Sequence, residues 1–238
     1  MNRIELIQSI LDKTNFCNYL EIGTLRGDSF LPVVCKNKIA VDPAFRISFI
    51  KRLKWEKRNP SNKQNRYYKM TSDSFFDKVT SKEIEIDRID IALIDGMHTF
   101  AYSLRDVFNC LKYLNKNGII VMHDCLPPRE SAAIPIDYST KEGMKELNKI
   151  RGEWCGDVWK TIAYLRECHS DILESFVIDT DFGLGIVRPR AEFDKPPEIK
   201  HVEFERVFKI GYREMIASIE QFLGIKPDEY CSQLISEF

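Results

Sequence analysis

The chain has 238 residues, of which 44% are hydrophobic and 30% charged, with 11 Gly and 10 Pro. These values are typical of a globular protein and exclude a disordered, collagen-like or repetitive chain. The formal net charge of −1 argues against a protein that binds nucleic acid over its whole surface.

No apolar run reaches the length of a membrane span, and the first residues, MNRIELIQSILDKT, are an amphipathic pattern with acids rather than a signal peptide. The seven cysteines contain no CxxC pair, so neither a zinc ribbon nor a redox dithiol is indicated. We predict a cytoplasmic protein with reduced thiols and no membrane or nucleic-acid partner. The sequence does not decide whether the protein forms a homo-oligomer.

Helical patterns alternate with β-type runs over the first half of the chain. The expected helices cover 2–13, about 28–35, the basic stretch from 51, 72–80 with a Ser or Asp cap, and 100–114. The expected strands cover 17–23, 38–43, 66–72, 88–96 and 118–124. This order predicts an α/β fold with a doubly wound, mostly parallel sheet and right-handed crossovers.

The stretch KRLKWEKRNPSNKQNR, residues 51–66, holds seven basic residues and one acid, Glu56. No RNA- or DNA-binding motif accompanies it. We therefore interpret it as a solvated helix face followed by a polar turn, in preference to a nucleic-acid patch.

The order of elements changes after residue 125. Helices are expected over about 140–151, 156–168 and 202–223, and a hairpin over 175–189 around DTDFG. We predict one domain over 1–190 and a helical extension over 191–238, which packs on that domain or forms a dimer contact.

Polar side chains follow the expected strand ends, where ligands collect in parallel sheets. These residues are Glu21, Asp42, Ser72, Asp73, Asp95, His98, His123 and Asp124. The first turn, EIGTLRGDS, has Gly23 and Gly27 in a GxxxG spacing in place of GxGxxG, so the close backbone approach that a pyrophosphate needs is missing. A cofactor without phosphate is favoured, and Asp42 is placed to accept two ribose hydroxyls.

The segments YLEIGTLRGDS, AVDP, MTSDS, IDGMHTFAYSLRD and GIIVMHD resemble the class I S-adenosylmethionine-dependent methyltransferases over residues 17–125. The closer resemblance is to their metal-dependent O-methyltransferase branch, which includes macrocin-type and cephalosporin-hydroxylase-like proteins. This resemblance implies a Rossmann-like sheet whose last two strands form an antiparallel hairpin.

The resemblance also implies a cofactor site for S-adenosylmethionine. Gly23 and Gly27 would flank its methionine part, Asp42 would hold the ribose, and Ser72 with Asp73 would lie beside the adenine. Glu21 and Asp95 are further expected cofactor contacts.

Transfer of a methyl group to oxygen needs an activated hydroxyl, which a divalent cation and a base supply. The resemblance implies Asp95 and Asp124 as ligands of Mg²⁺ or Mn²⁺ and His98 as the base. His123 stands where some relatives have a second acid, so it is a further candidate ligand that suits softer ions.

Three aromatic residues are weaker substrate candidates: Tyr102, Trp154 and Trp159. Each has a plain structural interpretation, as a surface or packing residue. The predicted function is an S-adenosylmethionine-dependent O-methyltransferase for a hydroxylated small molecule or sugar, including glycan acceptors. A degenerate cofactor-binding or scaffold protein, and a hydroxylase or oxidoreductase of the same fold, are the alternatives.

Overall fold

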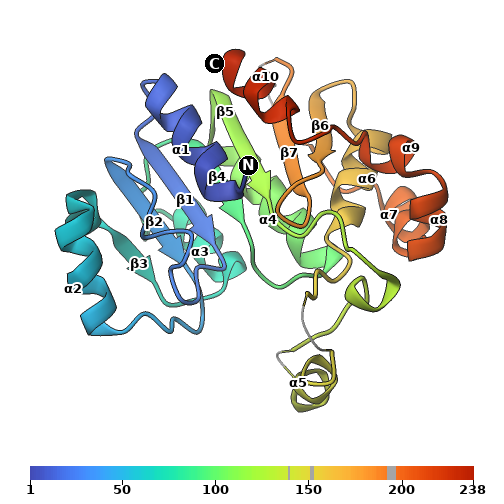
Figure 1. The fold of residues 1–238 in the computed structure, drawn as a ribbon, viewed down its shortest axis with the longest axis horizontal. Coiled ribbons are helices and arrows are strands. Elements are labelled where there is room, and N and C mark those ends of the chain that lie inside the picture. Colours follow the sequence, from blue (N-terminus) through green and yellow to red (C-terminus); the bar gives the residue numbers. More distant parts are fainter. Residues whose placement is uncertain (139, 151–152, 192–196) are drawn as a thin grey trace.

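The computed structural model describes residues 1–138, 140–150, 153–191 and 197–238 (Figure 1). Its centre is a seven-stranded sheet with strand order β3-β2-β1-β4-β5-β7-β6. The strands are β1 (Asn18–Ile22), β2 (Asn37–Val41), β3 (Arg66–Tyr68), β4 (Ile89–Ile94), β5 (Leu114–Met122), β6 (Leu173–Ile178) and β7 (Leu184–Pro189).

Strands β1 to β5 pair in parallel, whereas β7 runs antiparallel to both β5 and β6. The strand order reverses between β1 and β4, so their carboxyl ends flank the switch point of a doubly wound sheet. The predicted fold class is confirmed, including the antiparallel hairpin.

Helices cover both faces of the sheet (Figure 1). The α-helices are α1 (Arg3–Lys13), α2 (Phe49–Arg58), α3 (Ser72–Thr80), α4 (Phe100–Tyr113), α5 (Lys141–Leu147), α6 (Trp159–Cys168), α7 (His201–Phe208), α8 (Tyr212–Ala217), α9 (Ile219–Leu223) and α10 (Tyr230–Ser236). Two 3₁₀ turns, η1 (Pro60–Gln64) and η2 (Glu130–Ala132), complete the elements.

All six residues of β4 are buried because each face of this strand packs into a different core. Ala92 and Ile94 belong to a hydrophobic cluster shared with α3, α4 and α6. Ile91 and Leu93 belong to a second cluster shared with α1 and α10. A continuous apolar strand is therefore required at the middle of the sheet.

The helix predicted over about 28–35 is wrong, since this segment forms turns. Pro32 has no N–H to donate and disfavours helical geometry in Leu31 before it. Buried side chains bind the free carbonyl groups instead. Lys38 Nζ donates to the carbonyls of Phe30 and Val33, at 2.7 and 2.6 Å.

The single helix predicted over 202–223 is also wrong, because the structure divides it into α7, α8 and α9. Gly211, which has a low helix propensity, is the N-cap of α8. These helices pack beside α6, where Lys160 Nζ donates to the carbonyl of Phe208 at 2.7 Å. A domain boundary near residue 190 stays a prediction.

Two smaller differences concern helix ends. The cap of α3 is Thr71, whose side chain accepts from the N–H of Ser74, rather than a Ser or Asp within the helix. Helix α10 was not predicted, because its seven residues are too few for a clear periodic pattern. Within the described part of the chain, no helix combines the length and apolarity needed to cross a membrane.

Candidate active site at the carboxyl edge of the sheet

The turn after β1 passes so close to the end of β4 that a side chain cannot be placed at Gly23. Gly23 has φ +87°, and a Cβ there would lie 1.9 Å from the carbonyl oxygen of Asp95. Gly27 has φ +69°, and its Cβ would lie 2.9 Å from the Ile47 side chain. Both glycines are therefore explained by loop packing and positive φ, and the packing brings the β1 turn against the end of β4.

Asp42, after β2, is nearly buried and ties two loops together. The backbone N–H of Leu25 donates to its Oδ2 at 2.7 Å, and that of Ala44 donates to Oδ1 at 2.6 Å. Each carboxylate oxygen keeps lone-pair capacity for another donor. Asp42 thus shapes the β1 turn.

Glu21 lies in the interior below this turn and is fully buried. Its carboxylate accepts from the Tyr19 hydroxyl at 2.6 Å and from Ser29 Oγ at 2.9 Å. Burial raises the pKa of Glu21 to about 7, while the two hydrogen bonds oppose that rise. The geometry makes Glu21 a support of the turn.

The beginnings of α3 and α4 lie together at the same edge. Asp73 forms an ion pair with Arg105 at 2.9 Å, and the Arg105 guanidinium lies 4.3 Å from the centre of the Tyr102 ring. Tyr102 is 40% exposed, as a surface aromatic would be. Asp106 is buried beside Ser72, and its Oδ1 has no hydrogen-bond partner among the described residues.

Asp106 should make the folded state less stable as the pH rises. Burial raises its pKa from the usual 3.8 to about 7, opposed by the Ser72 hydroxyl. The folded state therefore holds a proton between pH 4 and 7 that the unfolded state lacks, so stability falls across that range and the loss persists above it. A shift of this size corresponds to about 4 kcal/mol.

Replacing Asp106 by asparagine removes this titration. We expect Asp106→Asn to gain about 2.5 kcal/mol relative to the native protein between pH 5 and pH 8, since part of the full loss has already occurred at pH 5; urea unfolding at both values measures the gain. Asp77→Asn, on an exposed position of α3, serves as the control. An equal difference from the native protein at both pH values would contradict the assignment.

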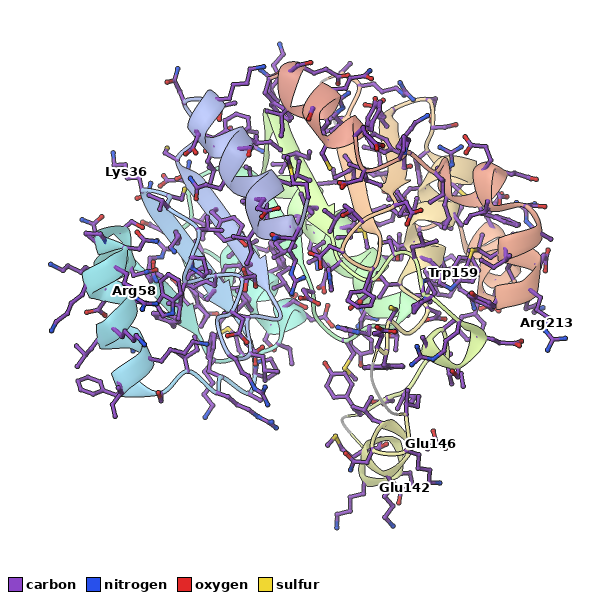
Figure 2. The ribbon with its side chains drawn as sticks, in the orientation of Figure 1. Lys36, Arg58, Glu142, Glu146, Trp159 and Arg213 are labelled. Carbon is purple, nitrogen blue, oxygen red and sulfur yellow. The ribbon has the colours of Figure 1, made fainter. Side chains whose placement is uncertain are left out.

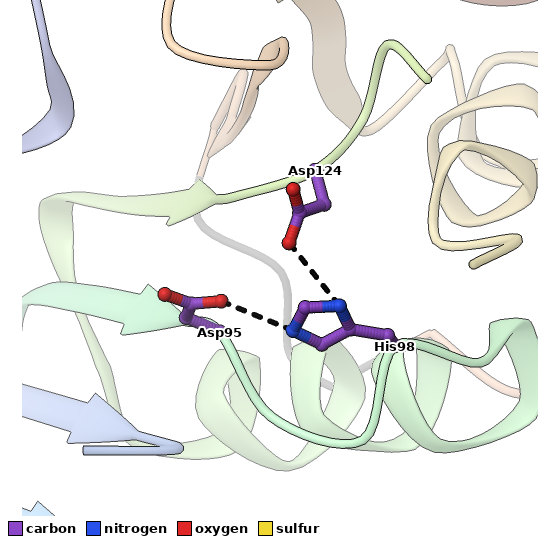
Figure 3. A group of neighbouring side chains, drawn as sticks. All are labelled: Asp95, His98 and Asp124. Atoms are coloured by element: carbon purple, nitrogen blue, oxygen red, sulfur yellow. Dashed lines mark ion pairs between the residues drawn. The ribbon is translucent and has the colours of Figure 1, made fainter. Parts of the chain in front are cut away.

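Asp95, His98 and Asp124 converge beyond the ends of β4 and β5. The imidazole of His98 lies between the two carboxylates, with Nε2 3.3 Å from Asp95 Oδ1 and Nδ1 3.2 Å from Asp124 Oδ2 (Figure 3). The side chains of Asp95 and His98 are less than one-fifth exposed, and Asp124 is buried.

The backbone at His98 and Asp124 is strained, and this strained conformation directs their side chains into the site. His98 has φ +52° and Asp124 has φ +62°, a region that few residues other than glycine adopt. Trp154 stacks on the His98 ring, with centroids 4.9 Å apart. Such strained residues cluster at functional sites, because the surrounding packing has to hold them.

His123 follows β5 and contacts the same carboxylates, with Nδ1 3.1 Å from Asp124 Oδ2 and 3.5 Å from Asp95 Oδ1. Arg3 Nη1 lies 2.8 Å from its Nε2. Burial alone would lower the pKa of His123, but Asp124, Asp181 and Asp95 raise it to about 11, so His123 is charged at neutral pH.

Arg3 and Asp181 are site residues that the sequence interpretation missed. Arg3 Nη1 donates to Asp181 Oδ2 at 2.9 Å, and Arg3 Nη2 lies 3.8 Å from Asp95 Oδ2. Arg3 begins α1, and Asp181 lies in the β6–β7 turn with φ +47°. The turn sequence DTDFG was the one available signal for Asp181.

Mutual attraction controls the protonation of this cluster. Burial alone would raise the pKa of Asp95, but hydrogen bonds and charges from His123 and His98 hold it well below its usual value. Burial alone would lower the pKa of His98, but Asp95 and Asp124 raise it. Asp95 is therefore ionised at neutral pH.

The donor set fits a divalent cation. Asp95, His98 and Asp124 each offer a ligand atom, and these atoms lie within 4.8 Å of one another. Two carboxylates with one imidazole suit Mn²⁺ or a similar transition ion as well as Mg²⁺. His98, expected as a base, is thus also a candidate ligand, whereas His123 lies outside this group of three.

The two tryptophans have different surroundings. Trp154 is half-buried against His98, and its Nε1 donates to the carbonyl of Ile134 at 2.8 Å. Trp159, labelled in Figure 2, is 1% exposed and belongs to the core with α4 and α6. Packing explains Trp159, so Trp154 is the better substrate candidate.

Comparison with known proteins supports this architecture. Residues 20–125 match the family model of a methyltransferase domain. A cofactor-bound structure of Rv0187 from MTB is 13% identical, with a TM-score of 0.53 over 81% of this chain and 82% of that one. A putative O-methyltransferase from Klebsiella pneumoniae is 11% identical, with a TM-score of 0.53 over 79% of each chain.

The SAH-bound methyltransferase PaMTH1 of Podospora anserina is 16% identical, with a TM-score of 0.51 over 80% of each chain. No curated protein matches the sequence. The sheet order and the antiparallel last pair define a Rossmann-like methyltransferase fold. The chain thus has the fold of the class I methyltransferases, and residues 20–125 match a methyltransferase domain, as the sequence motifs predicted.

Proposed function

We propose that this protein transfers a methyl group from S-adenosylmethionine to a hydroxyl oxygen of a small molecule or sugar, with the help of a divalent cation. The observation that carries this proposal is the convergence of Asp95, His98 and Asp124 beside the β1 turn of a methyltransferase domain. The similar proteins include one with SAH bound and one described as a putative O-methyltransferase.

The cofactor would lie across the carboxyl ends of β1, β2 and β4. The β1 turn with Gly23 and Gly27 would hold the methionine part, and Asp42 would accept from the ribose. Asp106 Oδ1 is a buried acceptor without a described partner beside Ser72. An amino group of adenine would satisfy that acceptor, which supports the placement of the base near Ser72 and Asp73.

Asp95 and Asp124 would hold the cation, which when bound lowers the pKa of an acceptor hydroxyl. His98 would complete the ligand set or accept the hydroxyl proton, because its ring reaches both acids. Trp154 would keep the ring in place by stacking. This arrangement favours an enzyme over a scaffold protein, because a scaffold would not need an acid–histidine cluster held in a strained backbone conformation.

Cofactor choice provides the first test. The purified protein should bind S-adenosylmethionine and SAH in preference to NAD in calorimetric titrations, because the turn lacks the middle glycine of dinucleotide sites. Asp42→Ala should weaken SAH binding by about tenfold or more, since two loop N–H groups lose their acceptor as well as the ribose. Asp87→Ala, an exposed acid before β4, is the matched control.

Tight NAD binding without any response to either methionine nucleoside would reject the cofactor assignment. A screen of hydroxylated small molecules and sugars with labelled methyl donor would then identify the acceptor by mass. Transfer of label to nitrogen or carbon, in place of oxygen, would reject the O-methyltransferase assignment while leaving the cofactor site intact.

A further inference from the structure

Helix α2 presents large apolar side chains to solvent. Phe49 is 72% exposed, Ile50 77% and Leu53 44%, and none of the ten residues of this fully described helix is buried. Leu53 lies one turn after both Phe49 and Ile50, at i+4 and i+3, so the three side chains form one patch. Contiguous exposed apolar side chains of this size mark an interaction surface.

The opposite face of α2 attaches the helix to the domain, so the apolar face cannot turn inward. Trp55 packs against the core cluster that contains α1. Arg52 lies over the Tyr67 ring at 4.7 Å, and Lys51 Nζ pairs with Asp28 at 2.5 Å. These contacts fix which side of α2 faces away from the sheet edge (Figure 1).

Basic side chains flank the apolar face. Lys54 and Lys57 lie one turn after Ile50 and Leu53, and both are exposed. Arg58, the last residue of the helix, is exposed as well, with its guanidinium 5.6 Å from the centre of the Trp55 ring. Phe49, Ile50, Leu53, Lys54 and Lys57 together are called the α2 surface.

We propose that the α2 surface docks on an anionic lipid bilayer. An interfacial helix combines large apolar residues on one face with lysine and arginine around them, which is the composition of this surface. The basic residues attract the anionic headgroups and the apolar ones enter the boundary with the acyl chains. The sequence alone predicted no membrane partner, and a helix that docks on a bilayer departs from that prediction. The observation behind the prediction, the lack of a membrane-spanning run, does not bear on a helix that lies at the membrane surface.

Other occupants fit less well. A symmetric contact with a second copy would place the basic residues of two α2 helices against one another, which like-charge repulsion opposes. Nucleic acid would satisfy the lysines but would gain little from Phe49 and Ile50, because phosphate contacts need no apolar side chains. An anionic bilayer uses both kinds of residue.

The attached face of α2 contacts the β1 turn, on the side of the helix away from the α2 surface. Lys51 Nζ donates to the carbonyl of Arg26 at 2.7 Å, and Arg46 N–H donates to that of Leu25 at 2.7 Å. Leu25, Arg26 and Arg46 are themselves exposed. The inference is independent of the proposed methyl transfer, because vesicle binding requires no acceptor and no cofactor.

Sedimentation with phosphatidylcholine vesicles, with and without phosphatidylserine, tests the proposal on the full chain. The protein should bind the vesicles that contain phosphatidylserine, bind them less as salt rises, and leave pure phosphatidylcholine largely unbound. Phe49→Ala with Ile50→Ala should weaken binding by about tenfold or more. Lys54→Gln and Lys57→Gln should each weaken it by about fivefold.

Val202→Ala is the matched control, since Val202 is 78% exposed on α7, outside the α2 surface. It should bind as the native protein does, and thermal unfolding should show that all variants fold. Failure of the native protein to bind the anionic vesicles would overturn the proposal. So would unchanged binding by the Phe49 and Ile50 variant, or binding of RNA that competes with the vesicles and ignores these two residues.

Discussion

Asp124→Asn is expected to weaken the binding of Mn²⁺ by about 100-fold or more, because loss of a ligand exceeds the 10- to 100-fold cost of losing a residue that only orients one. Asp124 supplies one of the three donor atoms that lie within 4.8 Å of one another. Asparagine preserves the size of the side chain and tolerates the positive φ of this position. Calorimetric titration with Mn²⁺ measures the effect.

In Asp124→Asn, the rate of methyl transfer should decrease together with the affinity for Mn²⁺. The affinity for SAH should stay within a few-fold of the native value. Added chelator should reproduce the loss in the native protein. Asp181→Asn is the matched control, since Asp181 also has a positive φ and contacts Arg3 but lies outside the donor set. It should change Mn²⁺ affinity by less than about tenfold.

Two results would contradict this metal assignment. Asp124→Asn could bind Mn²⁺ as tightly as the native protein, which would place the ion elsewhere. The native protein could bind no divalent ion and methylate its acceptor in the presence of chelator, which would leave His98 as a base held between two acids.

Trp159→Ala is expected to lower the free energy of unfolding by about 3–5 kcal/mol, because it removes a large side chain from a closely packed core. Trp159 is 1% exposed and lies at the start of α6, against the sheet. The loss is a large share of the stability of a typical domain. Urea unfolding monitored by circular dichroism gives the value.

Trp154→Ala provides the comparison within the same short segment. Trp154 is half-buried and contacts His98 at the site, so its loss should cost about 1 kcal/mol of stability and act mainly on turnover. Equal destabilisation by the two replacements would show that both tryptophans are packing residues. If Trp159→Ala kept the native stability but no longer bound the acceptor, Trp159 would be a substrate-binding residue rather than a packing residue.

Local sequence patterns determined which segments form the strands of the sheet and the helices packed directly on it. In β4, the run IDIALI is apolar except for Asp90, is long enough for one strand and has no polar alternation, so burial on both faces could be predicted. In α1, Leu6, Ile7, Ile10 and Leu11 recur at helical spacing, and all four are buried. The acids and histidines after β4 and β5 followed from the same strand positions.

Tertiary structure alone decided three other features. Arg3 and Asp181 reach the cluster from α1 and the β6–β7 turn, which are 178 positions apart. Lys38 binds the carbonyls that the segment after Gly27 leaves free, a contact between positions that local propensity does not relate. The apolar face of α2 points outward because Trp55 and Arg52 attach the other face. Periodicity reports which side chains share a helix face, whereas the side that is buried depends on contacts distant in sequence.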